Sequence, residues 1–218
     1  MDIIKKAVML AKERELDICL ASTTGNTARS ALEVISEINY TGRLVVVRNV
    51  CGFENAGENS MDAKIYDELV KNGVQVITAA HTLSGCERGI SKKYSGVYPV
   101  QIIADSLRML GQGVKVCVEI SLMANDAGAI TYGKPVVCVA GSGSGADTIC
   151  IVISQKPERG WVLCIRWETG LFMESTESAL LQRWKSVLWI RTRYCIMSWN
   201  RKTTVAPSFM CLSIIRLR

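Results

Sequence analysis

The chain has 218 residues, 49% of them hydrophobic and 21% charged, with a formal net charge of +6 at pH 7. This composition is typical of a globular protein that is large enough to bury a core without disulfides or metal ions. No apolar run approaches the roughly 18 residues that a membrane span needs, and the amino-terminal MDIIKKAVMLAKERE resembles an amphipathic helix rather than a secretory signal. We therefore expect a cytoplasmic protein without a transmembrane segment.

The first helix is followed by elements that alternate between strand and helix. Short apolar runs predict strands at residues 16–20, 43–47 and 74–78, and periodic runs predict helices at 27–38 and 61–71, the second capped by Asn59 or Ser60. Residues 79–99 form the longest irregular stretch, with room for a short helical turn.

The same alternation continues to about residue 153. We predict a helix at 100–110, a strand at Lys115–Ile120, a short helix at 121–130, and strands at 135–141 and 146–153. Strands alternating with helices indicate an α/β fold with a mostly parallel sheet. The last two strands are too close in sequence for a crossover helix, so we expect an antiparallel hairpin at one edge.

The composition changes abruptly after the last of these strands. Basic and acidic residues balance, at 16 each, up to residue 156, whereas the remainder carries the whole net charge, all five tryptophans and no aspartate. We predict a domain over residues 1–155 and an atypical basic tail over 156–218. Out-of-frame translation, a disordered segment, or a genuine amphipathic helix at Glu174–Arg193 that binds a membrane or a partner would each explain the tail.

The nine cysteines are odd in number and lack paired C-x-x-C spacing, so we predict no metal site. Four of them, Cys19, Cys117, Cys138 and Cys150, lie in apolar runs. We expect free thiols that serve as small core residues in a reducing compartment. The tail combines basic and aromatic residues but forms no known binding motif, so no nucleic-acid partner is expected.

Small polar residues follow several predicted strands, at the sheet edge where open α/β sheets bind ligands. The first group opens a helix and offers hydroxyls, free backbone N–H groups and a flexible glycine, which suit a phosphate. Its members are Ser22, Thr23, Thr24, Gly25, Asn26 and Thr27. It lacks the lysine of a Walker A loop, and an ordinary helix cap is the alternative interpretation.

A second glycine-serine turn follows the strand at 135–141. Its backbone N–H groups suit an anion, although a simple hairpin loop explains it equally well. The residues concerned are Gly141, Ser142, Gly143, Ser144 and Gly145.

Three side chains are candidates for acid–base chemistry. His81 is the only histidine, Glu119 would end an apolar strand, and Asp126 follows it; Asp147 is a weaker candidate in a turn. Glu87 and Arg88 are expected either to pair within their loop or to contact a ligand.

Five segments together resemble stand-alone proteins, found in archaea and some bacteria, that are related to the C-terminal α/β domain of pyruvate kinase. They are CLASTTGNTARSALE, GENSM, HTLSGCERGISKKYSG, KVCVEISLMANDAGAI and VAGSGSGADTICIVI, and the similarity covers residues 1–155. The resemblance implies a three-layer α/β/α sandwich of about five strands with one antiparallel edge strand. It also implies an anion at Ser22–Thr27, because the similar loop of pyruvate kinase holds a phosphate of an allosteric sugar bisphosphate.

Some stand-alone members are associated with flavin mononucleotide (FMN), whose phosphate would suit the same turn. Pyruvate kinase catalysis is not implied, since that active site lies in a barrel domain. Two hypotheses follow: a module that binds a phosphorylated small molecule or flavin nucleotide, and a flavin-dependent or acid–base enzyme that uses His81, Glu119 or Asp126. Assembly into a homo-oligomer stays open.

Overall fold

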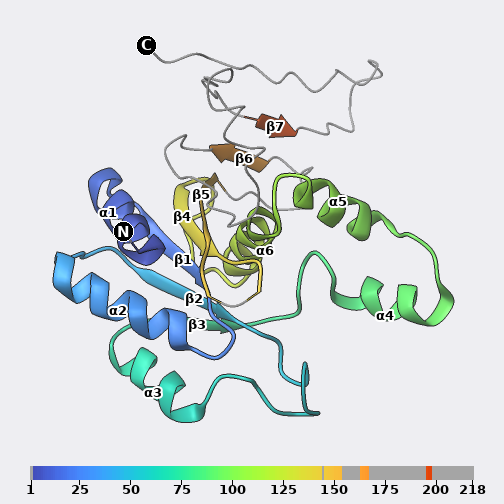
Figure 1. The fold of residues 1–218 in the computed structure, drawn as a ribbon, viewed down its shortest axis with the longest axis horizontal. Coiled ribbons are helices and arrows are strands. Elements are labelled where there is room, and N and C mark those ends of the chain that lie inside the picture. The colour runs from blue at the N-terminus through green and yellow to red at the C-terminus, as the bar shows by residue number, and fades with distance from the viewer. Residues whose placement is uncertain (1, 144, 154–162, 167–194, 198–218) are drawn as a thin grey trace, which may run out of the picture.

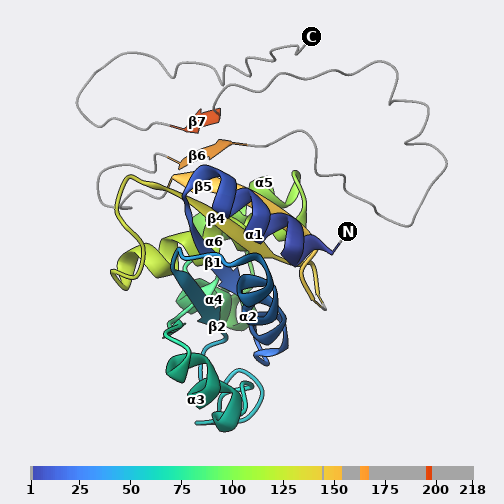
Figure 2. The same ribbon diagram turned by 90° about the vertical axis from the view of Figure 1, so that its left-hand side faces the viewer.

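The computed structural model describes residues 2–143, 145–153, 163–166 and 195–197, which form a β-sheet with helices on both faces (Figures 1 and 2). The strands are β1 (Asp17–Ala21), β2 (Leu44–Arg48), β3 (Gln75–Thr78), β4 (Pro135–Ala140), β5 (Thr148–Ile153), β6 (Leu163–Arg166) and β7 (Cys195–Met197). The helices are α1 (Ile3–Arg14), α2 (Asn26–Ile38), α3 (Ala63–Lys71), α4 (Gly85–Tyr94), α5 (Pro99–Arg108) and α6 (Gln112–Asp126).

The strand order is β3-β2-β1-β4-β5-β6-β7. The first four of these strands are parallel, and β5 is antiparallel to β4, as the sequence predicted for a hairpin. Residues 2–143 and 145–153 thus form the expected α/β/α sandwich on five strands with one antiparallel strand. Two short segments of the predicted tail, β6 and β7, continue the sheet in antiparallel pairing beyond β5.

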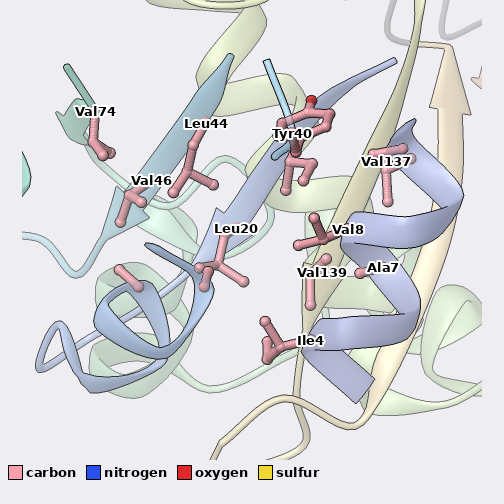
Figure 3. Packing of buried hydrophobic residues seen from close by; sticks show 14 of the residues in the cluster. Ile4, Ala7, Val8, Leu20, Tyr40, Leu44, Val46, Val74, Val137 and Val139 are labelled. Carbon is pink, nitrogen blue, oxygen red and sulfur yellow. The ribbon is translucent and has the colours of Figure 1, made fainter. Parts of the chain in front are cut away.

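Alternate residues of the strands pack on opposite faces of the sheet. Ile18 and Leu20 of β1 join a core beneath α1 and α2, whereas Cys19 between them joins the core beneath α6. Figure 3 shows the first core, in which Ile4 and Val8 of α1 lie against the sheet. Burial on both faces explains why the central strands are uninterrupted apolar runs in the sequence.

The core between the sheet and α6 contains the four core cysteines predicted from the sequence. Cys19, Cys117, Cys138 and Cys150 are free and buried. Burial raises the pKa of the Cys117 and Cys138 thiols well above their usual value, because a thiolate is poorly solvated there.

The strand predicted at Lys115–Ile120 was wrong, as was the separate short helix after it. Residues 115–120 and residues 121–126 of the predicted short helix all belong to α6, and 12 residues of α6 are buried between the sheet and α5. A helix that is apolar nearly all round shows no helical periodicity, and its β-branched valines favour a strand locally. Tertiary packing therefore overrides the local preference.

Two smaller differences concern loops. The helix predicted at 61–71 begins at Ala63, and its cap is Asp62, whose carboxylate accepts the N–H of Lys64 at 2.7 Å, rather than Asn59 or Ser60. The irregular stretch 79–99 contains the ten-residue helix α4. The amphipathic helix predicted at 174–193 lies outside the described residues. No helix in the described ranges is long and apolar enough to cross a membrane.

Candidate functional site

A cleft of about 1030 Å³ opens at the carboxyl ends of the parallel strands. The direction in which strands are added to the sheet reverses between β1 and β4. The strands that follow β1 in sequence, β2 and β3, lie on one side of it, and β4 lies on its other side. Such a switch point separates the loops that follow the two strands and leaves a crevice for a ligand. Both polar turns predicted from the sequence, after β1 and after β4, line this cleft.

Ser22 anchors the first turn rather than facing solvent. It is 4% exposed, its N–H donates to the carbonyl of Val47 at 3.1 Å, and its Oγ accepts the N–H of Ala28 at 3.4 Å. Ser22 therefore joins the end of β1 to β2 and satisfies one of the free N–H groups at the start of α2.

Gly25 is the residue before α2 and has φ +94°, a left-handed conformation that glycine adopts at little cost. A Cβ at this position would overlap the side chain of Ile65 in α3. Gly25 does not itself line the cleft. It shapes the turn and allows α3 to pack against it.

The remaining residues of this turn leave donors available at the cleft. Thr23, Thr24 and Asn26 are exposed, and all three line the cleft together with Thr27. Among the described residues, no acceptor takes the backbone N–H of Asn26 or Thr27. Two free N–H groups at a helix start, beside threonine hydroxyls, suit an anion.

The second turn is bound mainly to itself. The N–H and Oγ of Ser142 both donate to Asp147 Oδ2, at 2.9 and 2.5 Å. Burial raises the pKa of Asp147, but hydrogen bonds from Ser142 and Thr148 outweigh burial and bring that pKa below its ordinary value. Gly141, Ser142, Gly143 and Gly145 line the cleft, and Ser144 lies outside the described residues. Ser142 therefore uses both of its donors within the turn.

His81 follows β3 and lines the cleft. Its ring stacks near that of Phe53, with centroids 6.2 Å apart. The only histidine of the chain is therefore placed where it would meet a bound molecule, beside an aromatic ring from the loop after β2.

Glu119 lies within α6, not at a strand end as predicted. Its carboxylate accepts hydrogen bonds from Lys115 Nζ at 2.5 Å and from the N–H of Leu83 at 3.0 Å. The side chains of Glu119 and Lys115 are each 6% exposed. These contacts fit a buried charge that is paired and hydrogen-bonded. Asp126, at the exposed end of α6, is not among the residues that line the cleft.

Glu87 and Arg88 do not pair with each other. Glu87 Oε2 accepts the N–H groups of Val100 at 2.9 Å and Gln101 at 3.3 Å, so it caps the start of α5. Arg88 lines the cleft.

Within the part of the chain that the structure describes, five cations and three carboxylates line the cleft, and sequence reasoning missed most of the cations. The cations are Arg48, Arg88, Lys92, Arg108 and Lys115; the carboxylates are Glu54, Glu87 and Glu119. The position of Arg48 directly at the end of a predicted strand was a usable signal. Lys115 was hidden by the wrong strand assignment, and Lys92 and Arg108 resemble ordinary surface residues of helices.

No group of three His, Cys, Asp or Glu side chains within the described part of the chain is arranged to hold a metal ion. The family model described as the pyruvate kinase alpha/beta domain matches residues 1–152. The match covers every element from α1 to β4 and nearly all of β5.

Proposed function

The chain belongs to the pyruvate kinase alpha/beta domain family, and on that premise we propose that it binds a phosphorylated small molecule at this cleft without turning it over. The cleft lies at the switch point of the sheet, where α/β folds bind ligands. The proposal does not include pyruvate kinase catalysis. The free core thiols favour a reducing compartment, so we place this activity in the cytoplasm.

The observation that carries the proposal is the turn between β1 and α2. It presents the unpaired N–H groups of Asn26 and Thr27 and the exposed hydroxyls of Thr23 and Thr24 to the cleft. The partial positive charge at the start of α2 favours an anion at the same point. Cations outnumber carboxylates among the lining residues, which also favours a negatively charged ligand.

The ligand class that fits is a phosphomonoester with a polar body. The cleft is as large as the upper end of the roughly 300–1,000 Å³ found for small-molecule sites, so it has room for more than the phosphate. FMN and sugar phosphates both carry the required group. The stacked Phe53 and His81 offer an aromatic surface that would favour the flavin.

The enzyme hypothesis depends mainly on His81. Of its three candidates, Glu119 is held in a buried ion pair and Asp126 lies outside the cleft lining. If a reaction occurs here, His81→Ala should abolish turnover while leaving binding intact, and unchanged turnover would remove His81 from the mechanism.

Calorimetric titration with inorganic phosphate and with FMN tests the binding proposal. Thr24→Val should weaken phosphate affinity at least tenfold, about 1.4 kcal/mol, because it removes a hydroxyl donor to an anion. Thr41→Val is the matched control, since Thr41 is exposed in the loop before β2 and does not line the cleft. Equal affinities for the wild type and both variants would remove this turn from the binding site.

A further inference from the structure

Helix α4 stands apart from the layers of the sandwich. None of its ten residues is buried, and its main neighbour is α5 (Figure 1). Most of its surface is therefore in contact with solvent, although it forms one wall of the cleft. A helix with so few buried contacts is held in place weakly.

The cleft side of α4 is defined by Glu87, Arg88, Ser91 and Lys92. Residues at this spacing lie on one face of a helix. Glu87 faces α5, where it caps the first turn. Arg88 and Lys92, one turn apart, are the charged groups that this face presents to the cleft.

The other cations of the cleft are already engaged. Arg108 pairs with Asp105, Lys115 pairs with Glu119, and Arg48 donates to Thr78 and lies over the ring of Tyr66. Arg88 and Lys92 have no side-chain partner within the described ranges. Two unneutralised cations thus occupy the least constrained wall of the cleft.

The two ends of α4 differ in how the backbone is held. Upstream, the N–H of Leu83 is fixed to Glu119 in α6. Downstream, Ser95 has φ +61° and Gly96 has φ +106°, an unusual pair of left-handed residues that ends the helix. Gly96, which as a glycine has access to both signs of φ at little cost, is the position that would absorb a rotation of α4.

We infer that α4 is a lid that closes on the bound anion and brings Arg88 and Lys92 to the ligand held at Asn26 and Thr27. This inference rests on the proposed function, because it assumes an anion at that turn. Closure neutralises the two cations and supplies charge-assisted hydrogen bonds that the open form lacks. The lid thereby adds a set of specificity contacts to those of the first turn.

Hydrogen-exchange mass spectrometry of the full chain with saturating inorganic phosphate tests the lid, with chloride at equal ionic strength as the reference. The inference predicts slower exchange both at residues 22–28 and across 85–96. Protection at 22–28 alone would overturn the lid and leave the binding site intact. No protection at either segment would overturn the proposed function as well.

The double variant Arg88→Gln/Lys92→Gln gives a second test, because both residues are exposed and their replacement should not disturb folding. We expect phosphate affinity to fall roughly tenfold and protection of α4 to disappear, while protection at 22–28 persists. Lys93→Gln is the matched control, since it removes a charge from the same helix outside the cleft. If the double variant behaves like the control, α4 does not contact the anion.

Discussion

Glu119 holds the backbone of Leu83: its Oε1 accepts that N–H at 3.0 Å while Oε2 accepts Lys115 Nζ at 2.5 Å. One buried carboxylate therefore joins α6 to the segment that leads into α4. This arrangement favours a structural role for Glu119 over proton transfer.

Glu119→Ala should be strongly destabilising. It leaves Lys115 as an uncompensated buried charge and Leu83 without an acceptor, and we expect a loss of about 3–5 kcal/mol in the free energy of unfolding, measured in urea. The double variant Lys115→Met/Glu119→Gln removes the charge and keeps an acceptor for Leu83, so it should lose much less. Equal losses would contradict the ion-pair explanation.

Gly25→Ala should destabilise the protein for two separable reasons. The left-handed φ of +94° costs a residue with a Cβ about 1–2 kcal/mol, and the new Cβ would overlap Ile65. Adding Ile65→Ala should remove only the second part, so the two substitutions should be non-additive in a double-mutant cycle. If the two changes in the free energy of unfolding simply add, the overlap between the new Cβ and Ile65 does not contribute to the destabilisation.

Tyr40 should make the protein sensitive to alkaline pH. Burial and the nearby Asp17 raise the pKa of its phenol well above the ordinary value, and its hydroxyl donates to the carbonyl of Leu16 at 2.6 Å. Because the folded state holds the phenol proton more tightly than the unfolded state does, protonated Tyr40 stabilises the fold. This contribution to the free energy of unfolding is complete below about pH 10 and falls as the pH rises above it. Tyr40→Phe should flatten that part of the stability–pH curve; an unchanged slope would refute the assignment.

Asp147 should act in the opposite direction, at acid pH. The pKa of Asp147 is lower in the folded protein than the ordinary value of 3.8, so the ionised carboxylate stabilises the fold. This stabilisation is fully present at a pH above 3.8 and is lost as the pH falls through the lower pKa of the folded state. Asp147→Asn should therefore lower the unfolding temperature at neutral pH and make little difference in strong acid. A difference that is constant across pH would exclude the charge as its cause.

The buried thiols should be inert to labelling. Cys51 and Cys86 are exposed, whereas Cys19, Cys117, Cys138 and Cys150 are buried in the core between the sheet and α6. A thiol reagent followed by peptide mass spectrometry should modify the first two rapidly and the other four only in denaturant. Rapid labelling of Cys138 in the native state would show that this core opens readily.

Much of the fold follows from local pattern. The strands at β1, β2 and β3 are short apolar runs bounded by polar residues, and α2 has a clear apolar face, so each was predicted within a few residues of its observed position. The hairpin of β4 and β5 followed from the short connection alone. The position of the turn at Ser22–Thr27 followed from its place after β1.

The missed features depend on contacts between distant segments. α6 could not be recognised because burial on nearly all sides removes the periodicity that identifies a helix. The pairing of Glu119 with Lys115 became visible only once both lay on that helix. Glu87 caps α5 and Arg88 lines the cleft, and both positions depend on residues that sequence spacing does not connect to them.

The central claim is that the start of α2 binds an oxyanion. Crystals of the full chain soaked in tungstate would locate such an ion directly through its anomalous scattering. We predict a peak within hydrogen-bond distance of the backbone N–H groups of Asn26 and Thr27. Peaks confined to other surfaces, with none at this turn, would contradict the claim and leave Ser22–Thr27 as an ordinary connection between a strand and a helix.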